Sequence, residues 1–158
     1  MFGKKKAVLV SYVWSDLKEI PQEALDDTKH ITQVLLFGNH LVSIPSSIDR
    51  YWKNITILNL HSNYLRTLPD ELCSLKVLEE LHLDSNRLVA LPENIGQLTR
   101  LKTLWLNENR LSSLPKSFIN LVNLTQFCVA FNMFKNVPLC ISNMPKLRHI
   151  SFEHNPII

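Results

Sequence analysis

The sequence predicts an α/β fold: a right-handed β/α (or β/3-10) solenoid, with its parallel sheet on the concave face. One observation behind this prediction is an asparagine that recurs first after 24 residues and then four times after 23. These asparagines are Asn39, Asn63, Asn86, Asn109, Asn132 and Asn155. Another is that six of the eight prolines share one position of the same repeat: Pro21, Pro45, Pro69, Pro92, Pro115 and Pro138. Self-similarity at a fixed period of this length is typical of stacked supersecondary units.

Alignment on the asparagines gives the pattern LxxLxLxxNxLxxLPxxIxxLxx, most clearly from Leu78 to Arg100 and from Leu101 to Asn123. The LxL segment alternates with a period of two, which predicts a short strand with inward leucines. The asparagine follows at a sharp turn, where its buried side chain can bond backbone groups that no neighbouring strand reaches. Proline fixes φ at about −65° and begins the return segment of the coil. Apolar residues three apart then predict a short α or 3-10 turn.

Stacking of the coils follows from the size of one repeat, which cannot bury its own leucines. Neighbouring coils bury a continuous core. Equivalent side chains such as Leu81, Leu104 and Phe127 are therefore expected in a single buried row.

The repeats resemble the leucine-rich-repeat family, in its 23-residue subclass with the LPxxIxxL return. That subclass is similar to intracellular Ras-suppressor and scribble-type proteins, plant intracellular Ras-group repeats and some bacterial effectors. The resemblance covers residues 31–158, as five full repeats and a terminal partial one. It implies a protein-binding scaffold or adaptor in signal transduction, with a small GTPase, phosphatase, kinase or ubiquitin-ligase component as partner. The alternative is a substrate-targeting repeat domain of a larger enzyme, such as a ubiquitin ligase or a bacterial effector.

Residues 1–30 fit the repeat only loosely and are interpreted as a degenerate N-terminal capping repeat, because terminal repeats are usually atypical. Ser15 stands where the asparagine recurs, and Lys4, Lys5 and Lys6 precede an apolar run from Ala7 to Trp14. This run is short for a signal peptide and is followed by charges, so a first strand is favoured. The strand at the other end, near Asn155, would present an open edge through which a homodimer is possible.

Composition narrows the function classes. With 158 residues, a net charge of +3 and 20% charged residues, the chain suits one folded domain. Its three cysteines form no disulfide or zinc pattern and favour a reducing, cytoplasmic location. No apolar run approaches the roughly 18 residues of a membrane span. Phosphate loops and catalytic motifs are not found, so neither an enzyme nor a cofactor is expected. Nucleic acid is not expected as a partner, because no basic track follows the predicted strands.

The outward strand positions form columns, with one residue from each repeat. The central column contains His82 and Trp105, and the next contains His61, Asp84 and Asn107. Trp, Tyr and Arg are enriched at binding hot spots. The sequence therefore predicts a protein-binding patch of Trp105, Asp84, His82, Asn107, Arg87, Arg110, Tyr64, Phe131 and His61. Solvated strand residues with no partner are the alternative.

His61, His82 and Asp84 are within reach of one metal ion, because neighbouring strands lie about 4.8 Å apart. Three ligands on an open surface would lack supporting hydrogen bonds, so a polar recognition patch is favoured and no metal is expected. In that patch His61 and Asp84 are expected to pair across the strands.

Overall fold

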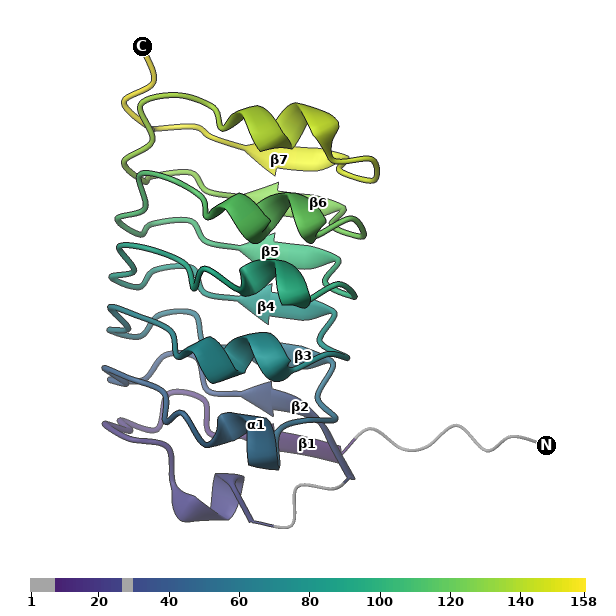
Figure 1. Cartoon of the computed structure of the whole chain (residues 1–158). Helices are drawn as coiled ribbons and strands as arrows, with labels where there is room; N and C mark the ends of the chain where they lie inside the picture. Colours follow the sequence, from purple (N-terminus) through teal and green to yellow (C-terminus); the bar gives the residue numbers. More distant parts are fainter. Residues whose placement is uncertain (1–7, 27–29) are drawn as a thin grey trace, which may run out of the picture.

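The computed structural model describes residues 8–26 and 30–158. Its strands form one parallel sheet in which sequence order is also spatial order, so each coil stacks on the one before it (Figure 1). The strands are β1 (Val8–Ser11), β2 (Ile31–Leu35), β3 (Ile57–Asn59), β4 (Glu80–His82), β5 (Thr103–Trp105), β6 (Gln126–Cys128) and β7 (His149–Ser151). The predicted solenoid of strands and short helical turns is confirmed.

Short helices return the chain on the side of the coil away from the sheet (Figure 1). They are η1 (Gln22–Ala24), α1 (Ile48–Tyr51), η3 (Asp70–Ser74), η4 (Ile95–Gln97), η5 (Lys116–Asn120) and η6 (Leu139–Asn143), where η marks a 3-10 helix. Pro69 and Pro115 directly precede η3 and η5, with φ values of −70° and −66°. Proline thus presets the backbone angle at which the helical turn begins.

The coil with the 24-residue interval differs from the others, because its return contains the α-helix α1. The amide of Trp52 donates to the Ile48 carbonyl at 2.8 Å. Trp52 is fully buried, and its indole Nε1 donates to the Ala24 carbonyl at 3.1 Å. The additional residue therefore accommodates a full α turn that carries a large side chain against the first coil.

The core is a set of parallel rows of apolar side chains. Leu81, Leu104 and Phe127 lie in register on neighbouring strands and are all fully buried. Each such side chain contributes about 1.5–3 kcal/mol through burial. The single row expected from the sequence is confirmed. It ends at Ile150 on β7, which is 44% exposed because β7 pairs only with β6.

A ladder of buried asparagines joins the coils at the turn after each strand. Asn86 is typical: its Oδ1 accepts the amide of Leu65 at 3.0 Å, and its Nδ2 donates to the carbonyls of Leu60 and Leu83 at 3.0 and 3.1 Å. These backbone groups lie in two successive coils, so the side chain supplies the hydrogen bonds that a sheet would otherwise provide. The structural role predicted for the asparagine is confirmed.

The first coil joins the same sheet and the same ladder. β1 pairs in parallel with β2, and Asn39 Oδ1 accepts the amides of Ser15 and Leu17, both at 3.0 Å. The capping role of residues 1–30 stays a prediction. Lys4, Lys5, Lys6 and Ala7 lie outside the described residues.

Candidate functional site

The strand face, meaning the side of the sheet opposite the buried rows, carries the polar and aromatic columns that the sequence predicts. The register aligns Asn59, His82, Trp105 and Cys128 across β3 to β6. Period-two alternation turns these side chains away from the core, while Leu58, Leu81 and Leu104 face into it. The columns therefore form one continuous surface over the middle of the sheet.

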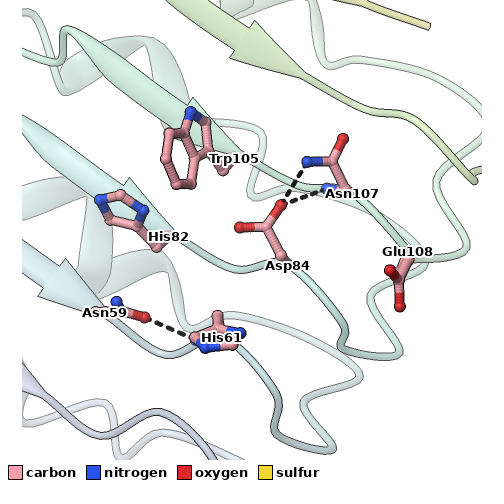
Figure 2. A pocket seen from close by; sticks show the side chains of 7 residues that line it. All are labelled: Asn59, His61, His82, Asp84, Trp105, Asn107 and Glu108. Atoms are coloured by element: carbon pink, nitrogen blue, oxygen red, sulfur yellow. Dashed lines mark hydrogen bonds between the residues drawn. The ribbon is translucent and has the colours of Figure 1, made fainter. Parts of the chain in front are cut away.

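A pocket of about 440 Å³ opens at the centre of this face (Figure 2). Its lining residues are Asn59, His61, His82, Asp84, Trp105, Asn107 and Glu108. Five of the nine predicted binding residues therefore line one pocket. Asn59 and Glu108 were missed, although each stands in a column beside a predicted residue.

Trp105 forms one wall of the pocket and is 37% exposed. The His82 ring meets it edge-on, with 4.6 Å between ring centroids and an interplanar angle of 83°. His82 Nε2 lies 3.3 Å from Glu80 Oε2, which holds the imidazole in place. The indole is thus oriented by a neighbouring coil while part of its surface stays open to a ligand.

Asp84 lies opposite Trp105 and is held by the next coil. Its Oδ1 accepts hydrogen bonds from Asn107 N at 2.9 Å and from Asn107 Nδ2 at 2.8 Å (Figure 2). Burial raises the pKa of the Asp84 carboxyl above its ordinary value, and the hydrogen bonds from Asn107 oppose that rise. The carboxylate is therefore well positioned, but the hydrogen bonds from Asn107 do not fully replace the hydration that its charged form has lost.

The third wall contains His61, which the sequence expected to pair with Asp84. Within residues 8–26 and 30–158 no such ion pair forms, so this expectation is wrong. The His61 ring stacks on Phe37 with 5.0 Å between centroids, and its Nδ1 lies 3.0 Å from Ser62 Oγ. Asp84 is bonded to Asn107 instead.

The remaining predicted residues lie outside the pocket. Arg87 places its guanidinium 4.3 Å from the centroid of the Tyr64 ring, which also stacks on His40. Arg110 is exposed. Phe131 is 52% exposed and stacks on His154, with 4.1 Å between centroids. These groups form an aromatic and cationic border beside the pocket.

A second hollow, of about 410 Å³, lies over the turns at the ends of the first strands. Trp14 lines it together with His40 and Tyr64 and is 69% exposed. The sequence placed Trp14 in the first strand and missed it as a surface residue. Its position one residue before Ser15, in the column of Gly38, was the available signal.

The column before the ladder asparagines has a backbone feature that the sequence did not reveal. Its members all have positive φ, between 51° and 70°: Gly38, Ser62, Ser85, Glu108, Phe131 and His154. This left-handed turn reverses the chain after each strand and sets the direction of the side chains at the border of the face. Of the described coils, only the second, which follows β2, uses glycine there, where a Cβ would come within 2.3 Å of the Trp14 ring of the first coil.

Neither metal binding nor thiol chemistry is supported at this site. Among the residues that the structure describes, no three histidine, cysteine, aspartate or glutamate side chains are grouped to hold a metal ion. Cys128 lies beside Trp105 in the central column, and burial raises the pKa of its thiol. A raised pKa leaves little reactive thiolate.

The profile of the leucine-rich repeat region matches residues 57–155, so the chain belongs to the leucine-rich-repeat family. Among curated proteins, it is 32% identical over 64 residues to a probable serine/threonine-protein kinase of Dictyostelium discoideum. That match covers 38% of this chain and 5% of the kinase. Leucine-rich repeats generally serve as protein interaction modules, and solenoids of this kind offer extended binding surfaces.

Solved structures confirm the fold. The Leptospira interrogans leucine-rich-repeat protein LIC12759 is 28% identical with a TM-score of 0.80, over 96% of this chain and 44% of that one. The repeat domain of the type III effector XopL gives a TM-score of 0.81 at 24% identity, over 98% of this chain and 53% of that domain's chain. The ectodomain of the receptor kinase SOBIR1 from Arabidopsis thaliana gives 0.69 at 30% identity, over 84% and 78%. The chain thus spans less than half of the Leptospira protein. Of the described residues, none lies in a helix long and apolar enough to cross a bilayer.

Proposed function

We propose that the chain is a scaffold or adaptor that binds a protein partner on its strand face, with the pocket between Trp105 and Asp84 at the centre of the contact. The observation that carries the proposal is a partly exposed tryptophan in mid-sheet, held by His82 and lining an open pocket. Such residues dominate interface energetics when a partner covers them. The border of Arg87, Tyr64 and Phe131 supplies further groups of the same type.

The 23-residue repeat supports assignment to the intracellular subclass, whose partners include small GTPases, phosphatases, kinases and ubiquitin-ligase components. The free thiols of Cys73, Cys128 and Cys140 support a reducing, cytoplasmic setting. Within this proposal the chain performs no chemistry itself and acts in signal transduction by bringing other proteins together.

The binding test begins with capture of partners from cells that express the protein. Wild type, Trp105→Ala and the control Ile119→Ala serve as baits, since Ile119 is a 42% exposed residue of η5 on the helical side. Each captured protein is purified and titrated against all three baits by calorimetry. The expected loss for Trp105→Ala is about 2 kcal/mol, or about thirtyfold in affinity, with no change for Ile119→Ala. Equal affinity of a folded Trp105→Ala variant would overturn the proposal.

The alternative is that these repeats target substrates for a larger enzyme. It is favoured by the small share of the Dictyostelium kinase that the chain matches, 5%. An immunoblot of the native source separates the two possibilities. A band well above the mass of 158 residues would favour the targeting domain, whereas a band at that mass would contradict it.

A homodimer through the edge of β7 is a second proposal. It is favoured by Ile150, which is 44% exposed at the end of a row that is buried from Val34 to Phe127, and by Leu139, which is 89% exposed. Sedimentation equilibrium of wild type and Ile150→Lys tests it. A concentration-dependent dimer that the lysine abolishes is expected, and a monomeric wild type would overturn the idea.

A further inference from the structure

We propose that the pocket on the strand face takes a lysine or arginine side chain of the partner, with Asp84 as its counter-ion and Trp105 as the surface against which its stem packs. This inference rests on the proposed function, because it names the chemistry that the binding face recognises.

The free oxygen of Asp84 is the first observation. Both hydrogen bonds from Asn107 go to Oδ1, and no hydrogen bond from another described residue reaches Oδ2; the amide of Asp84 itself is a further donor close to the carboxyl. Figure 2 shows this second oxygen directed into the space between Trp105, His82 and His61. The Asn107 bonds hold the carboxyl group in that orientation, so an acceptor is already positioned for a donor that no other residue in the described part of the chain supplies.

The charge of the lining is the second observation. Its seven residues include two carboxylates, Asp84 and Glu108, and neither lysine nor arginine. A third carboxylate, Glu80, lies beside His82 at 3.3 Å. These carboxylates would repel an anionic ligand inside the pocket, whereas they would attract a cation, which would fix the register of the partner.

Burial makes this attraction larger than at an open surface. Because loss of water raises the pKa of Asp84, its charged form is held at a cost in free energy. A cation placed within about 4–6 Å of the carboxylate favours the charged form and offsets that cost. The site is therefore complementary to a positive charge in a way that a fully hydrated aspartate is not.

Trp105 suits the rest of such a side chain. Lysine and arginine pack their methylene stems along apolar surfaces while the charged end reaches a polar group. Aromatic rings also attract cations that lie over their faces, within about 6 Å of the centroid. The pocket volume of about 440 Å³ leaves room for one long side chain, with the partner backbone lying across the open strand face.

The test uses random peptides displayed on phage and selected separately against wild type, Trp105→Ala, Asp84→Asn and Glu93→Gln. Asp84→Asn keeps an oxygen to accept the Asn107 hydrogen bonds, removes the negative charge and puts an NH2 donor in place of the free oxygen. Glu93→Gln is the matched control, because it removes one negative charge from an exposed residue outside the pocket. Circular dichroism verifies that each variant is folded.

Wild type and Glu93→Gln are expected to select peptides with lysine or arginine at one fixed position, and Asp84→Asn to lose that preference. Synthetic peptides with arginine at this position are then compared with their citrulline forms, which keep the shape and lose the charge. Citrulline is expected to weaken binding at least tenfold for wild type and less than twofold for Asp84→Asn.

The remaining outcomes separate the inference from the proposed function. Peptides that require Trp105 but carry no basic residue, or that tolerate citrulline, overturn the inference and leave the proposed function standing. Peptides that bind Trp105→Ala as tightly as wild type overturn both. Failure to select any peptide overturns the inference, and the capture experiment then decides the proposed function alone.

Discussion

Asp84 Oδ1 accepts two hydrogen bonds from Asn107, and Asn107 Oδ1 in turn accepts the amide of Ala130 at 2.9 Å. Side chains thus connect three successive coils just beyond the ends of β4, β5 and β6. The connection fixes the carboxylate of Asp84 at the pocket even though burial disfavours its charge. Positioning for a ligand and stability of the fold therefore act against each other at this residue.

Replacing Asp84 with asparagine is expected to raise the free energy of unfolding at neutral pH. The pKa of Asp84 is higher in the folded state than its ordinary value of 3.8, so folding favours the neutral form. Its contribution to stability is fully present below pH 3.8 and is lost as the pH rises through the raised pKa. Urea unfolding of wild type and Asp84→Asn at a series of pH values should give the variant the higher free energy of unfolding at neutral pH. The difference between the two proteins should become smaller in acid. A variant less stable than wild type at neutral pH would contradict this account.

Removal of a ladder asparagine is expected to destabilise the middle of the solenoid most. Asn86→Ala leaves the Leu65 amide buried without its partner, at about 1–3 kcal/mol, whereas the carbonyls of Leu60 and Leu83 keep hydrogen bonds from Asn63 and Asn109. With the two shared hydrogen bonds also lost, we expect a total loss of about 2–4 kcal/mol in urea unfolding. Asn155→Ala is the control, because Asn155 makes equivalent bonds but is only half-buried, and water can replace them. Its expected loss is about 1 kcal/mol, and equal losses at both positions would show that burial does not set the cost.

The fold was predictable from the sequence because each structural role recurs at a fixed spacing. Asn86 and Asn109 occupy the same position, and a leucine that packs in one coil packs equally in the next. This redundancy gave the strand register, so that His82 and Trp105 were placed side by side correctly. Repetition could not reveal departures from the average repeat, such as the α turn at α1 or the buried Trp52.

The candidate site was less predictable because its details depend on side-chain pairing within a column. The sequence placed His61, Asp84 and Asn107 on one face, and the pocket includes all three. It could not decide whether Asp84 turns toward the earlier coil or the later one. Asn107 offers its backbone N–H and its side-chain Nδ2 to one oxygen, which His61 cannot match while its ring stacks on Phe37.

The three thiols are expected to react at different rates in the folded protein. Cys73 is buried, and desolvation raises the pKa of its thiol to about 11, so thiolate is scarce and reagent cannot reach it. Cys128 and Cys140 are half-buried, with more modest rises in pKa from the same cause. Iodoacetamide labelling read by peptide mass spectrometry should modify these two slowly and leave Cys73 intact. All three should react in urea. Modification of Cys73 in native buffer as fast as Cys140 would show that this part of the core opens readily.

The left-handed turns predict a reversal in how two substitutions rank. Ser85 has a φ of 51°, a conformation that costs most residues about 1–2 kcal/mol and glycine almost nothing. Ser85→Gly is therefore expected to be more stable than Ser85→Val by about 1–2 kcal/mol. Ser113 is the control, because it is an exposed serine that is not among the positive-φ residues. There the free energy of unfolding of Ser113→Val should exceed that of Ser113→Gly by about 0.5–1 kcal/mol, because glycine loses more chain entropy on folding. Urea unfolding of the four variants measures both differences. The same rank order at both positions would mean that the turn relaxes away from positive φ. The backbone at the border of the strand face would then change conformation more easily than its hydrogen bonds indicate.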